Sequence, residues 1–304
     1  METVAVVLQE PERLTLSPVA LNPRNEGDVV VDVEWSGIST GTERLLWSGR
    51  MPPFPGLGYP LVPGYESVGR VAEGPMPAGT SVFVPGASCF RDVRGLFGGA
   101  ASRLVVPAER VIPLDDDLGD KGVLIALAAT AHHALGGSTP ELIVGHGVLG
   151  RLIARLSVLR GGAPTVWETQ TARSNGAQGY TVVHPDHDDR RDYSVICEVS
   201  GDPSIFDSLV MRLSRGGEIV VAGFYDRISF DFPPAFMKEA RLRIAAEFAP
   251  ADLHAVSELV REGLLSLDGL ITHRRPAADA ADAYAEAFTD PTCLKMLLDW
   301  RQKS

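Results

Sequence analysis

The chain contains 304 residues, which is enough for two domains, and its 45% hydrophobic content is typical of a globular protein and excludes a disordered one. Its 28 basic and 39 acidic side chains give a formal net charge of −11, which repels phosphate backbones, so we expect no nucleic-acid partner. Three widely spaced cysteines and the lack of a long apolar stretch predict a cytoplasmic protein without a disulfide framework or a membrane span.

The first 118 residues have the pattern of a β-rich domain. Short runs of β-branched and aromatic residues alternate with turns rich in glycine and proline. The stretch at 50–64 contains too many prolines for a helix and is predicted to be a loop. The expected strands lie at 4–9, 28–38, 66–74, 80–86 and 102–114.

Helical and extended patterns alternate from residue 119 onward, as in a parallel sheet covered by helices on both faces. One helix is expected to end at Gly136, and another to begin at Asp202 and Pro203 and to end at Gly216. The other predicted helices lie at 148–160, 251–265 and 277–288, and the strands at 141–144, 165–168, 193–200, 217–224 and 293–300. The sequence therefore predicts an α/β fold after an all-β beginning.

Three glycines separate the strand at 141–144 from the next helix. Gly145 permits a tight turn, Gly147 lets the backbone approach a pyrophosphate, and Gly150 lets the helix pack close to the sheet. The phosphates are expected over the helix N-terminus, which Val148 and Leu149 begin, because its free N–H groups and dipole favour negative charge. A bare glycine pattern is weak evidence, and the alternative is an ordinary turn of an α/β sheet.

An acidic residue at the end of the following strand strengthens the cofactor interpretation. Glu168 follows the last glycine at the spacing expected for a carboxylate that binds the adenosine ribose, and it repels a 2′-phosphate, so NAD is favoured over NADP. Arg173 is the opposing signal, because an arginine in this loop accommodates such a phosphate. Residues at two later strand ends are expected to complete the site, although each also fits simple turn chemistry: Ser200, Gly201, Ala222, Gly223 and Phe224.

Further motifs extend over nearly the whole chain, namely GISTGTE at 37–43, VPGYESVGRV at 62–71, TAHHAL at 130–135, EVSGDP at 198–203 and LSRGGEIVVAGF at 213–224. In this order they resemble the medium-chain dehydrogenase/reductase superfamily. The resemblance implies a GroES-like β domain formed by 1–118 and 275–304, and a Rossmann domain with a doubly wound parallel sheet formed by 119–274. It also implies that Thr130 contacts the nicotinamide and that the protein is a homodimer through the Rossmann edges.

Within this superfamily, the string WSGISTGTERLLWSGRMPPFPGLGYPLVPGYESVGRV at 35–71 is similar to the dehydrogenases that act on the 3-(1-hydroxyethyl) group of bacteriochlorophyllide in bacteriochlorophyll biosynthesis. That resemblance implies an NAD-dependent oxidoreductase that converts this group of a chlorophyllide or bacteriochlorophyllide to 3-acetyl. The substrate would be a tetrapyrrole.

The positions that bind catalytic zinc in metal-dependent relatives carry other residues here. Ser39 and Tyr65 stand where the resemblance expects a cysteine and a histidine, and 126–129 is a run of alanines and leucine. Zinc requires nitrogen and sulfur ligands in a tetrahedral set, so we expect no metal.

Without a metal, side chains must remove the alcohol proton. The resemblance aligns Thr42 with a hydroxyl relay, and Tyr65 and Glu66 lie at the edge of the lost metal site. Tyr65 would act as a base only if its pKa fell, and Glu66 fits a structural role equally well. His133 is a further candidate base, and its alternative is a packing or capping role on its helix.

A tetrapyrrole also needs a broad apolar surface. Trp47, Phe54 and Tyr59 lie in or before the proline-rich loop and are candidate substrate residues, with packing of the loop on the β domain as the alternative. Two other functions remain open at this stage. One is a zinc-free NADPH-dependent quinone or enoyl reductase of the same superfamily, and the other is a non-catalytic cofactor- or pigment-binding protein.

Overall fold

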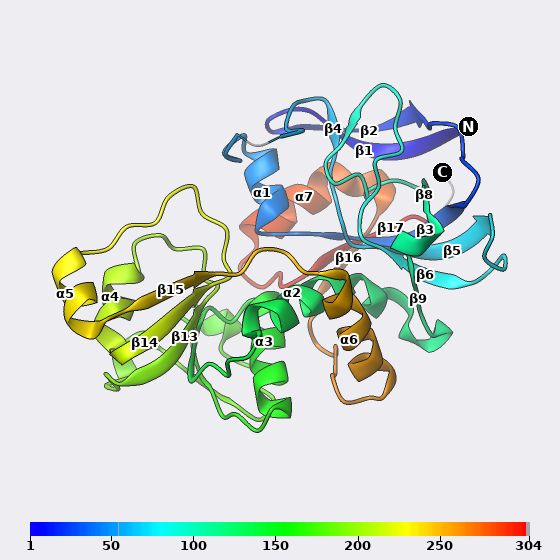
Figure 1. Cartoon of the computed structure of the whole chain (residues 1–304). Coiled ribbons are helices and arrows are strands. Elements are labelled where there is room, and N and C mark those ends of the chain that lie inside the picture. Colours follow the sequence, from blue (N-terminus) through cyan, green and yellow to red (C-terminus); the bar gives the residue numbers. More distant parts are fainter. Residues whose placement is uncertain (54, 302–304) are drawn as a thin grey trace. The chain divides into compact units, whose positions relative to one another are not determined.

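A computed structural model describes residues 1–53 and 55–301 of the chain (Figure 1). The chain folds into two compact units. Unit 1 comprises Met1–Ala126 and Asp268–Ser304, and unit 2 comprises Leu127–Leu267. Because both ends of the chain belong to unit 1, unit 2 is an insertion between them. The architecture is α/β, as the sequence predicts.

Unit 1 contains two β-sheets. The first sheet has the strand order β2-β1-β4-β7, and its strands β1 and β2 are antiparallel. The second sheet has the strand order β16-β17-β3-β5-β6-β9, and β8 pairs with β3 beside this path. Apolar side chains from the strands and from the last helix form its core. The first sheet consists of β1 (Glu2–Glu10), β2 (Arg13–Ala20), β4 (Leu61–Val62) and β7 (Arg94–Gly95). The second consists of β3 (Asp28–Ile38), β5 (Ser67–Glu73), β6 (Ser81–Val84), β8 (Arg103–Pro107), β9 (Ile112–Pro113), β16 (His273–Pro276) and β17 (Met296–Asp299).

Two helices belong to unit 1, α1 (Thr42–Trp47) and α7 (Ala280–Thr289). The C-terminal strand β17 pairs antiparallel with β3, with Met296 opposite Ile38. This pairing places the end of the chain beside the segment that leads into α1. Short 3₁₀ turns complete the unit at Ala108–Arg110, Asp116–Leu124 and Ala277–Asp279.

Unit 2 is built on a parallel sheet of order β12-β11-β10-β13-β14-β15. Its strands are β10 (Leu142–Val144), β11 (Thr165–Trp167), β12 (Thr181–Val183), β13 (Tyr193–Glu198), β14 (Leu213–Val221) and β15 (Arg241–Ile244). Its helices are α3 (Val148–Leu159), α4 (Phe206–Arg212), α5 (Phe232–Lys238) and α6 (Pro250–Arg261), and α2 (Ile125–Leu135) begins at the unit boundary. Further 3₁₀ turns lie at Thr171–Arg173 and Pro185–His187.

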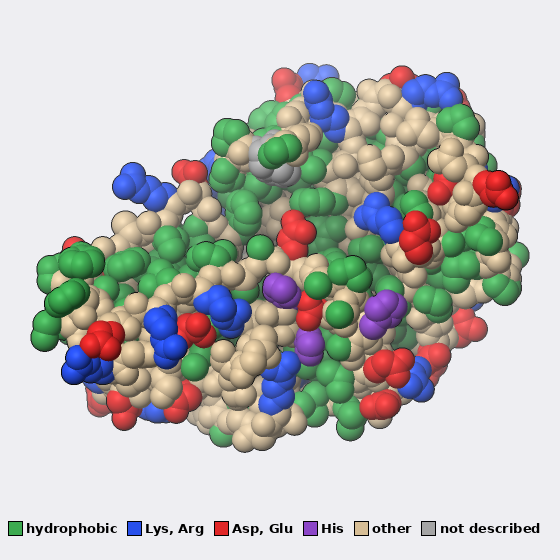
Figure 2. All heavy atoms as spheres, in the orientation of Figure 1, with side chains coloured by type: hydrophobic (Ala, Val, Ile, Leu, Met, Phe, Trp, Pro, Cys, Tyr) green, Lys and Arg blue, Asp and Glu red, His purple; other side chains and the backbone are tan. Residues whose placement is uncertain are grey.

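Apolar side chains are exposed at the β15 edge of unit 2. Figure 2 shows hydrophobic side chains gathered over α5, at the left of the view. Phe232 and Phe236 on α5 are 71% and 65% exposed, Met237 is 71% exposed, and Ile244 on β15 is 64% exposed. Such a patch is typical of a surface that another molecule covers.

Several sequence expectations need correction. The helix expected to begin at Asp202 begins at Phe206, because the Asp202 carboxylate instead accepts the Ser204 N–H in a preceding turn. The strand expected from Gly217 begins at Leu213, and its pairing with β13 shifts in register between Leu213 and Glu218. Segments 119–126 and 268–274, expected in the Rossmann domain, lie in unit 1. Eight elements have no counterpart among the sequence expectations, namely β2, β4, β7, β12, β15, β16, α1 and α5.

No helix among residues 1–53 and 55–301 has both the length and the apolar character that a membrane span requires.

Candidate active site

The glycine turn of unit 2 joins β10 to α3. Gly145 has a φ of +107°, and a Cβ at Gly150 would lie 1.9 Å from the Gly145 carbonyl oxygen, so neither position accepts a larger residue without movement. A Cβ at Gly147 would meet nothing within 4 Å. The turn therefore leaves open space at Gly147, directly before the first helical residues Val148 and Leu149. This is the geometry that lets a pyrophosphate approach the helix N-terminus.

Glu168 lies at the end of β11 beside this turn. Its carboxylate accepts the backbone N–H of His146 at 3.2 Å and that of Gln170 at 2.8 Å. A carboxylate offers about four acceptor sites, so capacity remains for ribose hydroxyls. Glu168 thus lies beside the glycine turn with acceptor capacity to spare.

The side chain of His146 stabilises the conformation of the glycine turn. Its imidazole is buried, with Nδ1 2.6 Å from the Arg173 carbonyl oxygen and Nε2 2.9 Å from the Tyr180 hydroxyl. Burial, followed by the charge of Arg151, lowers the pKa of His146 to about 4, so the ring is neutral at pH 7. Arg151 also donates to the His146 and Arg173 carbonyls, which fixes the loop that carries Arg173.

A hydrogen-bond network surrounds Glu198 at the carboxyl ends of β13 and β14. The buried Glu198 carboxylate accepts the N–H of Ser200 at 2.7 Å and the hydroxyl of Tyr225. The Gly201 N–H donates to the Tyr225 hydroxyl at 3.1 Å, and a Cβ at Gly223 would lie 2.5 Å from the same oxygen. Burial raises the pKa of Glu198 to about 7. This network holds the residues expected to bind the cofactor in place, namely Ser200, Gly201, Ala222 and Gly223. The adjoining Phe224 is 53% exposed.

On α2, His133 is paired with a carboxylate. Its Nδ1 lies 2.9 Å from Asp252, and Nδ1 of His132 lies 2.7 Å from the other oxygen of the same side chain. Asp252 also accepts the Ala249 N–H at the start of α6. These contacts connect α2 to α6 and favour the structural interpretation of His133 over the catalytic one. Thr130 lies one turn earlier on α2 and is half-buried.

In unit 1, three hydroxyl groups meet where β3 leads into α1. The Tyr65 phenol donates to Ser39 Oγ at 2.8 Å, and Thr42 also hydrogen-bonds the phenol. Burial is the largest cause that raises the pKa of Tyr65 above its usual value, followed by the charge of Glu66. The phenol therefore stays protonated near pH 7 and serves as a hydrogen-bond donor, which removes the condition under which Tyr65 would act as a base.

Glu66 is fully buried and forms an ion pair with Lys295. Lys295 Nζ lies 2.7 Å from Glu66 Oε2 and donates to the Ile38 carbonyl oxygen at 3.2 Å. Glu66 Oε1 has no hydrogen-bond partner among the described residues. The contacts favour the structural role for Glu66, because its charge is balanced by a buried ammonium.

The positions at which the resemblance expects zinc ligands carry a donor set that does not suit this metal. Ser39 contributes a hydroxyl and Tyr65 a protonated phenol, while Ala126, Ala128 and Ala129 are buried and apolar. Burial raises the pKa of the Cys89 thiol to about 11, which disfavours a thiolate ligand. These side chains cannot supply the nitrogen and sulfur ligands of a zinc site.

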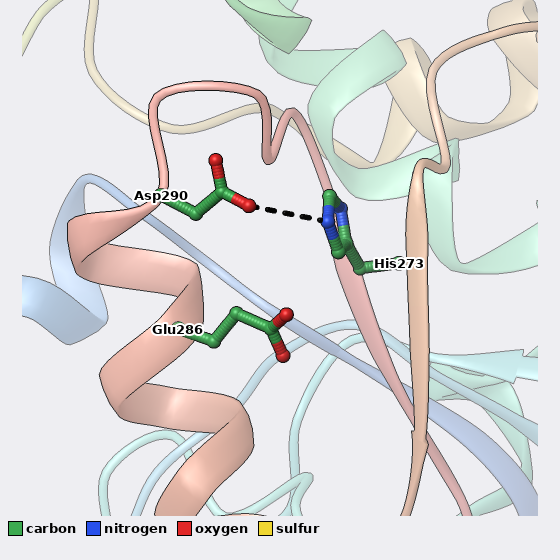
Figure 3. Close-up of side chains that lie close together, drawn as sticks. All are labelled: His273, Glu286 and Asp290. Carbon is green, nitrogen blue, oxygen red and sulfur yellow. Dashed lines mark ion pairs between the residues drawn. The ribbon is translucent and has the colours of Figure 1, made fainter.

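Another group of side chains resembles a metal site more closely (Figure 3). Potential ligand atoms of His273, Glu286 and Asp290 all lie within 4.8 Å of one another. Glu286 is paired with Arg275 at 2.9 Å, and His273 Nε2 lies 3.5 Å from Asp290. Because Glu286 is paired with Arg275 and Asp290 lies beside His273, the group is explained as a connection between β16 and the end of α7.

Of the three expected substrate residues, Trp47 and Tyr59 pack on unit 1. The Trp47 ring lies 5.5 Å from that of Phe288, and the Tyr59 hydroxyl donates to the Leu46 carbonyl. Both side chains border an apolar cluster that includes Leu46 and Met51. Phe54 lies outside the described residues. The described contacts show how the loop is held against the β domain.

Sequence reasoning missed Glu43, Lys295, Tyr284, Glu198 and Tyr225. Glu198 had a local signal, because it is a charged residue in an otherwise apolar strand. Lys295 had a similar signal between apolar residues of the C-terminal strand region. Their partners are distant in sequence, so the pairs themselves were not accessible to a local reading.

Comparisons with known proteins identify relatives of the whole chain. Residues 25–116 match the model of the alcohol dehydrogenase GroES-like domain. Over 99% of both chains, the protein is 57% identical to 2-desacetyl-2-hydroxyethyl bacteriochlorophyllide A dehydrogenase of Rhodobacter capsulatus and 56% identical to that of Cereibacter sphaeroides. The fold is similar to that of an alcohol dehydrogenase from Escherichia coli CFT073 solved with NADH, with a TM-score of 0.83 at 21% identity over 98% of this chain and 99% of that one.

Proposed function

Because the chain belongs to the 2-desacetyl-2-hydroxyethyl bacteriochlorophyllide A dehydrogenase family within the medium-chain dehydrogenases, we propose that it oxidises the hydroxyethyl group of a bacteriochlorophyllide to acetyl with NAD and without zinc. The observation that supports this activity is the sequence identity of 57% and 56% to two bacteriochlorophyllide dehydrogenases over 99% of both chains. The reaction breaks the carbinol C–H and O–H bonds and releases one hydride and one proton.

The residues of unit 2 fit a nicotinamide dinucleotide. The open space at Gly147 and the free N–H groups at the start of α3 receive the pyrophosphate, and Glu168 binds the ribose hydroxyls. When bound, the nicotinamide would supply the hydride acceptor for the carbinol carbon. The negative charge of Glu168 disfavours a 2′-phosphate, which supports NAD over NADP.

The three hydroxyls of unit 1 are our choice for moving the alcohol proton. Tyr65 donates to Ser39 Oγ, and Thr42 adjoins the same phenol. A hydroxyl can accept the substrate proton while it donates its own hydrogen onward, so the group passes the proton towards water without storing charge. We assign Ser39 and Thr42 to this relay, and Tyr65 to orienting it.

No step requires zinc. The hydroxyl and phenol at Ser39 and Tyr65 support this part of the proposal, because neither is a zinc ligand of the usual kind. The conjugated macrocycle also spreads the positive charge that develops at the carbinol carbon, which makes hydride loss easier than from an ordinary secondary alcohol.

The aromatic residues in and before the proline-rich loop are proposed to meet the tetrapyrrole, with Trp47 on α1 and Tyr59 in the loop as the described members. We also propose a reducing, cytoplasmic setting, which the free thiols of Cys89, Cys197 and Cys293 support.

The activity is tested by mixing the purified protein with NAD and 3-(1-hydroxyethyl) bacteriochlorophyllide a and following the long-wavelength absorption band. Conjugation of the new carbonyl with the ring shifts this band to the red, and the shift should require NAD. Ser39→Ala should lower kcat by about 10²- to 10⁴-fold, the usual contribution of a positioned proton-transfer group. An unchanged spectrum, together with NADPH-dependent reduction of a quinone, would establish the reductase alternative instead. A protein that binds NADH but changes neither substrate would be a carrier.

A further inference from the structure

The peptide group that joins Ile38 to Ser39 is held on both sides by buried charges. Its carbonyl oxygen accepts a hydrogen bond from Lys295 Nζ at 3.2 Å, and its N–H donates to Glu43 Oε1 at 3.0 Å. Both charged side chains are fully or almost fully buried, with exposures of 1% for Lys295 and 0% for Glu43. Charge-assisted hydrogen bonds in a dry environment restrain a group more strongly than neutral ones do.

Each of these two partners is itself fixed by a second residue. The Tyr284 hydroxyl on α7 donates to Glu43 Oε2 at 2.5 Å, and Glu66 on the segment before β5 pairs with Lys295 at 2.7 Å. Tyr284 and Glu66 are also fully buried. Four residues from separate parts of unit 1 thus converge on one peptide group, directly before the Ser39 hydroxyl.

We propose that Glu43, Tyr284, Lys295 and Glu66 form a peptide clamp that positions the Ser39 hydroxyl for proton transfer. The clamp residues are positioning residues, since they act through the Ile38–Ser39 peptide. This inference rests on the proposed function, because the clamp matters for catalysis only if Ser39 takes part in proton transfer. A rigid peptide is useful here because displacement of a reacting group by about 1 Å costs about 10²-fold in rate.

The clamp also carries a titratable group. Burial, as the largest cause, raises the pKa of Glu43 to about 7; Glu66 raises it further, whereas Tyr284, the Ser39 N–H and Lys295 oppose the rise. Below that pH Glu43 is neutral and its bond to the Ser39 N–H is weaker, and above it the carboxylate accepts the bond at full strength. The clamp therefore tightens as the pH increases through about 7.

Tyr284→Phe tests the clamp with the loss of one hydroxyl that does not touch Ser39. Tyr193→Phe is the matched control, because Tyr193 is equally buried and its hydroxyl donates to the Asp188 carboxylate at 2.7 Å in unit 2. We expect Tyr284→Phe to lower kcat about tenfold, with an unchanged KM for NAD, and Tyr193→Phe to lower thermal stability without changing kcat. Loss of the Tyr284 bond removes a stabiliser of the Glu43 carboxylate, so the pH profile of kcat should shift to higher pH.

Glu43→Gln is the second variant. It keeps an oxygen for the Ser39 N–H but cannot ionise, so the component of the pH profile near 7 should vanish and kcat should stay at the low-pH level of the wild type across the whole range. An unchanged kcat and pH profile in both clamp variants would overturn the proposal.

A measurement without substrate separates this inference from the proposed function. Hydrogen exchange of the peptide that contains the Ser39 amide should accelerate at least threefold in Tyr284→Phe and stay at the wild-type rate in Tyr193→Phe. Equal exchange in all three proteins would refute the clamp, whatever the wild type does to the pigment. An inactive wild type whose Tyr284→Phe variant exchanges faster would refute the proposed function and leave the clamped peptide established.

Discussion

At the scale of single residues, we propose that coenzyme choice depends on Glu168. Its carboxylate already binds two backbone N–H groups beside the glycine turn, so it is present as a fixed negative charge. A fixed charge discriminates more strongly than a mobile one, because it does not move away from an approaching phosphate.

We predict that Glu168→Gln lowers the preference for NAD over NADP about tenfold or more, since one ionic hydrogen bond corresponds to roughly 1.5–3 kcal/mol. The ratio of kcat/KM for the two coenzymes measures the effect. Glu141→Gln is the control, because Glu141 is also in unit 2 but is paired with Arg190. A wild-type protein that prefers NADP, or an unchanged ratio in Glu168→Gln, would contradict the assignment.

At the scale of elements, the turn from β10 to α3 contains glycines that are needed for different reasons, one for packing of the fold and one for access of a cofactor. Gly150 is required by the fold, because a Cβ there would collide with the Gly145 carbonyl oxygen. Gly147 has a φ of −74°, which any residue adopts, and its surroundings are open. The free protein therefore does not need glycine at this position, whereas a bound pyrophosphate does.

Gly147→Ala should accordingly leave the free energy of unfolding within about 0.5 kcal/mol of the wild-type value and weaken NADH binding. Gly150→Ala should lower stability by about 1–3 kcal/mol, because the helix must move away from the strand. Thermal unfolding and NADH titration of both variants provide the comparison. Wild-type NADH affinity in Gly147→Ala would show that no phosphate passes over this residue.

At the scale of the whole molecule, the exposed apolar face on α5 and β15 supports a homodimer. β15 is the last strand of its sheet, so its outer edge has no neighbouring strand within the described residues. A second copy that pairs there would cover Phe232, Phe236 and Ile244 together.

We predict that Phe236→Glu converts a dimer into a monomer, as sedimentation analysis would show. Leu264→Glu is the matched control, because Leu264 is 53% exposed in unit 2 but lies after α6. A wild-type protein that sediments as a monomer at micromolar concentration would contradict the dimer, as would a Phe236→Glu variant that remains dimeric.

The sequence by itself was sufficient to predict the α/β fold class and the position of the glycine turn between β10 and α3. Periodicity revealed β10, α3 and β13, because their apolar residues repeat within a short window and do not depend on distant partners. It did not reveal the short edge strands β12 and β15, since their pairing is set by neighbours in the sheet.

Tertiary structure decided which polar groups act together. The Ser39–Tyr65 hydroxyl pair was within reach of the sequence, because the resemblance to the superfamily points to both positions. The clamp was not, because Glu43 is 241 residues from Tyr284, and Glu66 is 229 residues from Lys295. The energy of a buried charge depends on the partner that shares its dry environment. Helix α7 brings Tyr284 to Glu43, and the segment directly before β17 brings Lys295 to Glu66.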